Sequence, residues 1–262
     1  MTQINKEEFT TFSHLILDET IQSMQERGYQ VLFMPQLVDA RIEKKVDWNV
    51  WNSTLSIQAV GKTKQGARVV IYAHLPTSLA TPESIKASRY QGLIEGYSRF
   101  PQDEFQELVD ADEKTDAQGN RVIWVVDGQH HKNNSSKHAT TEAIDDLKVI
   151  AFLGGQERAK LYLQGLQELD EEYDRALKSP KDSLEYILTA CSSYTTHINN
   201  RSSYRLEYAN HLLTTYDFAL ASFLSLGVRG LRTLYTEGIH VEGVDGFGQT
   251  TGRRPNKKIK KI

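Results

Sequence analysis

The chain has 262 residues, of which 39% are apolar and 25% are charged, proportions typical of a globular protein that folds in water. No apolar run reaches the roughly 18–20 residues that span a bilayer, and the first residues lack the basic and apolar regions of a signal peptide. The one cysteine, Cys191, excludes an intrachain disulfide and a cysteine-based zinc site. We therefore expect a cytoplasmic protein with no membrane attachment.

The net charge of −3 is unevenly distributed along the chain. Residues 241–262 contain six Lys or Arg and two acidic residues, so this segment carries +4 and the remaining 240 residues carry −7. A basic C-terminal segment on an otherwise acidic protein indicates what the protein binds more than how it folds.

The first half of the chain is predicted to mix helices and strands. Apolar residues at helical spacing predict a helix over 4–27, and residues 29–34 resemble a short buried strand. Two β-rich runs, 54–60 and 67–75, flank a polar turn bounded by glycines, a pattern typical of a β-hairpin. Thr81 and Pro82 resemble a helix start, and this predicts two helices near 83–97 and 101–111.

The predicted secondary structure changes near residue 155, from mixed helices and strands to helices alone. The apolar runs 122–126 and 147–153 are strand-like, and Gly154-Gly155 stops the second. Helical periodicity then predicts helices over 156–178, 182–199 and 203–236, with the last at the centre of a bundle. The predicted fold class is α+β: a mixed region with a β-hairpin (1–155), a helical bundle (156–240) and a disordered, flexible basic tail (241–262).

One motif follows a predicted strand directly: "RVIWVVDGQHHKNN", residues 121–134. Asp and Gly favour turns, because Asp can bond nearby backbone and Gly tolerates positive φ, so a simple turn explains the motif. The run also resembles the DGQHR domain of the ParB-like superfamily, found in proteins tied to DNA modification, phage defence and mobile elements. Asp127, Gly128, Gln129 and His130 match its signature, and the apolar run 147–153 returns at a compatible distance.

This resemblance implies a polar site at the end of the strand. Asp127 and His130 would face a nucleotide or a backbone phosphate. His131 stands where the family has arginine, and Lys132 would partly replace the missing charge. We expect no metal and no cofactor, because adjacent histidines in a strand point to opposite faces and no zinc-binding spacing reinforces them.

Basic and aromatic residues suggest a nucleic-acid surface near the hairpin. Lys62, Lys64 and Arg68 cluster at its turn, and Trp48 and Trp51 precede its first strand. Cationic grooves with aromatic stacking platforms hold single-stranded nucleic acid. The competing interpretation is that the tryptophans belong to the core and that the lysines protect a strand edge.

The basic tail is the second predicted contact with nucleic acid or with an acidic protein surface. A flexible cationic arm gains affinity by releasing counterions. Its basic residues are Arg253, Arg254, Lys257, Lys258, Lys260 and Lys261.

The sequence thus predicts a DNA-binding protein of phage or mobile-element type. Two alternatives stay open: a non-enzymatic assembly protein of a virion or complex, and a nuclease-like enzyme using Asp127 and nearby histidines. A homo-oligomer is also left open.

Overall fold

A six-stranded antiparallel sheet forms the centre of the computed structural model, which describes residues 8–14, 17–48, 52–92, 94, 97–128, 138–139, 145–177, 185–190, 203–204, 217–229 and 248–254. Its strands follow the order β5-β10-β3-β4-β6, and β8 pairs with β10. They are β3 (Asn52–Lys62), β4 (Arg68–Ala73), β5 (Ser98–Arg99), β6 (Ile123–Asp127), β8 (Glu185–Ala190) and β10 (Leu220–Arg229). Because β10 pairs with β3, segments on both sides of residue 155 share one sheet.

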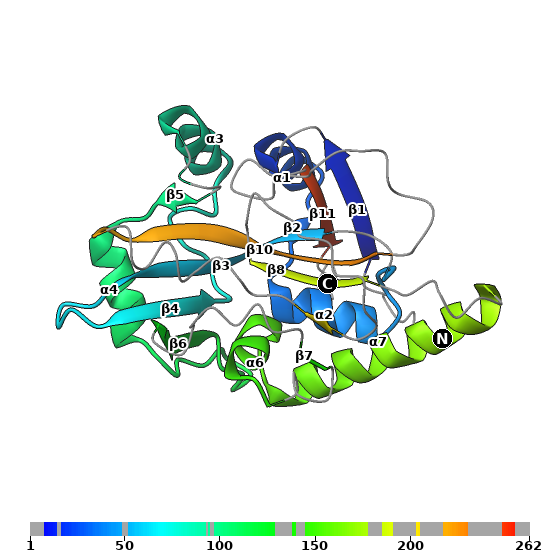
Figure 1. The fold of residues 1–262 in the computed structure, drawn as a ribbon. Coiled ribbons are helices and arrows are strands. Elements are labelled where there is room, and N and C mark those ends of the chain that lie inside the picture. Colours follow the sequence, from blue (N-terminus) through cyan, green and yellow to red (C-terminus); the bar gives the residue numbers. More distant parts are fainter. Residues whose placement is uncertain are drawn as a thin grey trace, which may run out of the picture.

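A smaller sheet joins the two ends of the described chain. Its order is β1-β11-β2, built from β1 (Glu8–His14), β2 (Gln30–Val31) and β11 (Gly248–Arg254). β1 and β11 pair antiparallel over their whole lengths, from Glu8 opposite Arg254 to His14 opposite Gly248. Figure 1 shows this sheet beside α1. A third sheet pairs β7 (His138–Ala139) with β9 (Ser203–Tyr204).

Helices cover both faces of the central sheet, as Figure 1 shows. They are α1 (Leu17–Glu26), α2 (Met34–Ile42), α3 (Pro82–Gln91), α4 (Gln102–Asp110), α6 (Leu147–Leu153) and α7 (Gln156–Leu177). Side chains of a strand alternate between its faces, so neighbouring residues of β4 enter different cores. Val70 and Tyr72 pack with α2, α6 and α7, whereas Val69 and Ile71 pack with α1, α3 and α4.

Several local predictions are confirmed. The hairpin predicted at 54–60 and 67–75 is β3–β4, and the strand at 122–126 is β6. The helix at 156–178 is α7, and the helix at 101–111 is α4. Thr81 caps α3, since its hydroxyl accepts the backbone N–H of Ser84 at 3.1 Å. That helix ends at Gln91, short of the predicted residue 97, because Gly92 follows at φ +85°.

Four predictions of element type are wrong. The helix expected over 4–27 is β1 followed by α1, because the aromatic and Thr residues of 8–14 pair with β11. The strand expected at 147–153 is α6: the Asp146 side chain accepts the Lys148 N–H at 2.8 Å, and Gly154 ends the helix in the left-handed conformation.

The helical bundle is also replaced by strands where the structure describes it. Residues 185–190, 203–204 and 220–229 are β8, β9 and β10. The residues from Leu220 to Leu224 are all buried. A continuous buried run of this kind fits a helix and a strand that is covered on both faces equally well. Residues 248–254, predicted within the disordered tail, are β11, held between β1 and β2.

Candidate functional site

The hairpin cluster predicted to bind nucleic acid is largely paired with carboxylates. Lys62 forms an ion pair and a hydrogen bond with Asp217, and this bond, together with the charges of Lys62 and Arg68, lowers the pKa of the Asp217 carboxyl. Lys64 lies 3.8 Å from Asp110. Arg68 is exposed and lies opposite Lys62 in the ladder. These pairings reduce the positive field that a phosphate backbone needs.

Trp48 is a packing residue and offers no open stacking platform. Its ring stacks on Tyr162 of α7 at 4.6 Å between centroids, and its indole N–H donates to the carbonyl of Arg41 at 3.2 Å. The outer edge of the ring meets α7 at Gly165, where an added Cβ would lie 2.9 Å from the indole. Trp51 lies outside the described residues.

The predicted basic tail is divided by the structure. Arg253 and Arg254 belong to β11. Arg254 pairs with Glu8 at 3.2 Å, donates to the Arg27 carbonyl and lies over the Tyr29 ring at 4.4 Å, so it fastens the small sheet to the end of α1. The other basic residues of the tail, Lys257, Lys258, Lys260 and Lys261, lie outside the described residues.

Asp127 ends β6, exposed and opposite Val69. The remaining residues of the motif, Gln129, His130, His131 and Lys132, lie outside the described residues. The structure therefore does not bring the predicted phosphate-facing residues together with the hairpin and β11 into one described surface. Figure 1 shows the β3–β4 turn at one edge of the molecule, away from β11.

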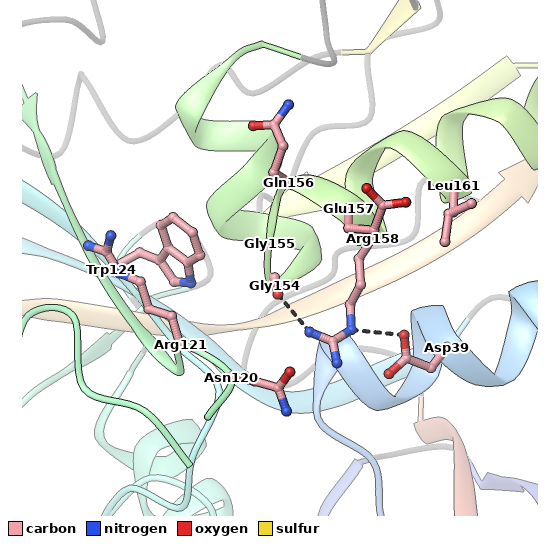
Figure 2. A pocket seen from close by; sticks show the side chains of 10 residues that line it. All are labelled: Asp39, Asn120, Arg121, Trp124, Gly154, Gly155, Gln156, Glu157, Arg158 and Leu161. Atoms are coloured by element: carbon pink, nitrogen blue, oxygen red, sulfur yellow. Dashed lines mark hydrogen bonds and ion pairs between the residues drawn. The ribbon is translucent and has the colours of Figure 1, made fainter. Parts of the chain in front are cut away.

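A pocket of about 460 Å³ lies where α2, β6 and the α6–α7 junction meet. Figure 2 shows the residues that line it. They are Asp39, Asn120, Arg121, Trp124, Gly154, Gly155, Gln156, Glu157, Arg158 and Leu161. Two arginines and two acidic residues make the lining close to neutral overall.

Arg158 is held in place by two fixed hydrogen bonds, drawn as dashed lines in Figure 2. Its Nε donates to Oδ1 of Asp39 at 2.8 Å, and one Nη donates to the carbonyl of Gly154 at 2.8 Å. Gly154 takes φ +82° and Gly155 φ +135°, so the chain turns sharply between α6 and α7 and directs the first turn of α7 to the pocket.

A short loop before β6 supplies the opposite wall. The Asp116 carboxylate accepts the backbone N–H of Gln118 and both the backbone and the side-chain N–H of Asn120. The side-chain bond from Asn120 is the main cause that lowers the pKa of Asp116. Because this loop is bonded within itself, Asn120 and Arg121 are presented to the pocket in a fixed orientation.

Arg121 covers one face of Trp124. Its guanidinium lies 4.1 Å from the ring centroid, and it is anchored to Oδ1 of Asp112 at 2.6 Å and to the Ile123 carbonyl at 2.8 Å. The indole N–H of Trp124 is buried and has no hydrogen-bond partner among the described residues. This buried N–H could not be found from the sequence, where Trp124 belongs only to an apolar strand.

Sequence reasoning also missed Arg158 and Asp39. Residues 39, 120–124 and 154–161 are far apart in the chain, so no spacing links them. The one available signal was Gly154-Gly155, where two glycines before a long helix mark a tight junction. Among the described residues, no group of three His, Cys, Asp or Glu converges to hold a metal, and no helix is long and apolar enough to cross a membrane.

Comparison with solved structures finds a protein of similar fold. No family model matches the chain, and no curated protein matches it. A solved structure from Nanoarchaeota, described as accommodating massive sequence variation by the C-type lectin fold, is similar at a TM-score of 0.66 and 26% identity. The match covers 96% of this chain and 100% of that chain. The α+β architecture is thus similar to a C-type lectin fold.

This match overturns the predicted function. A DNA-binding protein of phage type is wrong, because the similar structure is a C-type lectin-fold protein and the described basic residues are mostly paired. None of the comparisons bears on the resemblance to the DGQHR domain, which stays a prediction.

Proposed function

We propose that this chain is a binding protein in which a C-type lectin-like scaffold carries a recognition surface built from residues 191–216. The observation that carries the proposal is the similarity, over nearly the whole chain, to a protein described as accommodating massive sequence variation by this fold. A fold that accommodates massive sequence variation suits recognition, because the residues that bind can change while the scaffold is kept.

The scaffold around this segment is built from buried strands. β10 pairs with β3 on one side and with β8 on the other, and Ala190, the last residue of β8, lies opposite Leu224. Asp217 is described again directly before β10. The first residues of β10, Leu220 to Leu224, are fully or almost fully buried. The described strands on either side of this segment in the sequence, β8 and β10, are thus paired with each other in the central sheet.

The composition of the segment suits recognition. Ser, Thr, Tyr, Asn and His make up 17 of the 26 residues from 191 to 216. Binding loops of antibodies favour Tyr, Ser and Asn, because Tyr gives contact area at low entropy cost and small polar residues give adaptable hydrogen bonds. Polar residue types of this kind are uncommon in a buried core, and this supports a role in recognition.

The test compares tolerance to substitution in two libraries of equal size. One randomises the Ser, Thr, Tyr, Asn and His positions of 191–202 and 205–216, and the other randomises the same number of buried positions in β3, β4 and β10. We expect most members of the first library to resist protease like the parent and most of the second to be cleaved. Selecting the first library against unrelated targets should then yield binders.

Two outcomes would contradict the proposal. If the first library loses protease resistance as often as the second, residues 191–216 are needed for the fold. If it stays folded but gives no binders, while an antibody library selected in parallel does, the segment is tolerant but not a recognition surface.

A further inference from the structure

The contacts that the structure describes between α7 and other elements lie in the first half of this helix. Tyr162 accepts a hydrogen bond from Arg41 of α2 at 2.8 Å, and Gly165 lies against Trp48. From there α7 continues for twelve residues, which is roughly 18 Å of helix. Figure 1 shows this second half, residues 166–177, extending past α2.

An apolar stripe continues along the second half of α7. By helical spacing, Leu166, Leu169 and Tyr173 fall on the side of the helix that carries Tyr162. Tyr162 is fully buried in the core, so the stripe prolongs the core-facing side of α7 beyond the last described contact. This pattern is typical of a helix that packs against another segment along its whole length.

Acidic residues border this stripe and select the kind of segment that can cover it. Residues 166–177 contain five acidic residues and one basic residue, Arg175, so this half of the helix carries −4. Asp170 and Glu172 fall on the two borders of the stripe, and Glu171 falls on the opposite side of the helix. A second copy of the helix would bring the same negative charge, and like charges oppose that pairing. The matching segment is therefore basic and contains apolar residues.

The tail that follows β11 has this composition. Residues 255–262 contain four lysines and no acidic residue, and Ile259 and Ile262 each follow a pair of these lysines. This charge of +4 is the largest positive charge of any segment outside the described residues; the next largest is +2, at residues 129–137. The tail is thus the part of the chain whose charge best complements the second half of α7.

The tail also begins near α7. Arg253 pairs with Phe9 in the small sheet, and the Lys45 ammonium lies 5.5 Å from the centroid of the Phe9 ring. Three residues after Lys45, Trp48 stacks on Tyr162 of α7. Figure 1 shows the arrowhead of β11 directed toward α2, the helix that packs on α7. Eight extended residues reach roughly 26 Å, which brings the second half of α7 within reach of the tail.

We propose that residues 255–262 dock along the second half of α7 in the same chain. The lysines of the tail lie beside the carboxylates of the helix, and its isoleucines cover the apolar stripe. Several weak ion pairs and a small apolar contact act together in such an interface, since a single exposed ion pair contributes little. Residues 191–216 take no part in this contact, so it stands independently of the recognition surface proposed above.

The test measures hydrogen exchange of the full chain in low-salt buffer by mass spectrometry of peptides from residues 166–177. A docked tail protects these amides, because the helix must release the tail before it opens. In the tail variant, glutamine replaces Lys257, Lys258, Lys260 and Lys261. We expect the peptides from residues 166–177 to exchange at least about threefold faster in this variant, whereas peptides from β4 should be unchanged.

Matched changes in α7 separate docking from a general effect of charge. Asp170→Asn combined with Glu172→Gln changes the helix charge by +2 at the borders of the stripe and should speed exchange as the tail variant does. Glu171→Lys makes the same change of +2 on the opposite side and should exchange like the parent. Within the tail variant, the change at Asp170 and Glu172 should have no further effect, because both changes remove one interaction.

Four outcomes would overturn the proposal. The tail variant may exchange like the parent, the effects of the tail and helix changes may add in full, or Glu171→Lys may speed exchange as much as the border changes do. The fourth is protection that rises with protein concentration, which would place the tail on a neighbouring molecule and not on its own helix.

Discussion

His74 shows how a single buried side chain makes stability depend on pH. Its Nε2–H donates to the Ala151 carbonyl at 2.8 Å, so the neutral ring accepts at Nδ1 from the Ser56 hydroxyl at 2.8 Å. That hydroxyl accepts the Met34 N–H at 2.7 Å. The ring thereby links β4, β3, α2 and α6. Burial is the main cause that lowers the pKa of His74 from 6.5 to about 4.

The pH dependence has a definite sign. Between pH 6.5 and 4 the unfolded chain binds a proton at this residue and the folded chain does not, so the free energy of unfolding falls as the pH falls. A shift from 6.5 to about 4 corresponds to a loss of about 3 kcal/mol across this window, complete near pH 4. Urea unfolding at several pH values measures it. His74→Gln cannot titrate, so its curve should be flatter; an equally steep curve would refute the assignment.

Gly165 places a packing constraint in the middle of α7. An alanine in a helix is usually favoured over glycine by about 1 kcal/mol. Here a Cβ would lie 2.9 Å from the Trp48 ring, which is itself held against Tyr162 and bonded to Arg41. We expect Gly165→Ala to destabilise the protein by about 1–3 kcal/mol, as overpacking does. Gln164→Ala, at an exposed position of the same helix, should change stability little. Chemical denaturation of both variants measures the difference, and a stabilised Gly165→Ala would show that Trp48 moves freely.

Elements defined by local signals could be predicted from the sequence, whereas those defined by distant partners could not. The β3–β4 hairpin and α7 have their turn, periodicity and length within a few residues. Residues 220–226 pair with residues 52–60 of β3, which are far away in the sequence, and their apolar pattern fits helix and strand alike. The helical conformation of residues 147–153 is set by the Asp146 cap and by Gly154, and the seven side chains between them do not indicate it.

The candidate site could not be predicted for a related reason. Trp124, Arg158 and Asp39 are ordinary residues of a strand and two helices, and only tertiary packing places them around one pocket. An unpartnered N–H is a property of the packed structure and leaves no mark in composition or spacing. The motif at the end of β6 is noticeable in the sequence because its residues are consecutive. The pocket is built from three separate elements, so its residues are not consecutive and no motif marks them.

At the scale of the whole molecule, the small sheet ties the first and last described strands together. Gly252 of β11 lies tightly against α1: an added Cβ would be 2.3 Å from Met24 Cε and 2.9 Å from Tyr29 Cβ. We expect Gly252→Ala to push β11 away from α1 and to destabilise this sheet by about 1–3 kcal/mol. Hydrogen exchange followed by mass spectrometry should show residues 8–14 and 248–254 losing protection together, because each is the other's partner.

The central sheet supplies the internal reference for that experiment. Peptides from β4 should keep their protection in Gly252→Ala, since the ladder hydrogen bonds of β4 run to β3 and β6 within the central sheet. Equal loss of protection in β4 would mean that the two sheets open as one unit and that the ends cannot open alone.

The direction of the β1–β11 pairing also determines how the molecule responds to tension. Glu8 and Arg254 face each other at one end of a ladder of seven residue pairs. A force applied between these two residues would load the pairs one after another, beginning with Glu8 and Arg254, instead of shearing all seven at once. The fold should therefore peel apart at low force when stretched between its two ends, yet resist far better when it is held at one end and pulled through the central sheet.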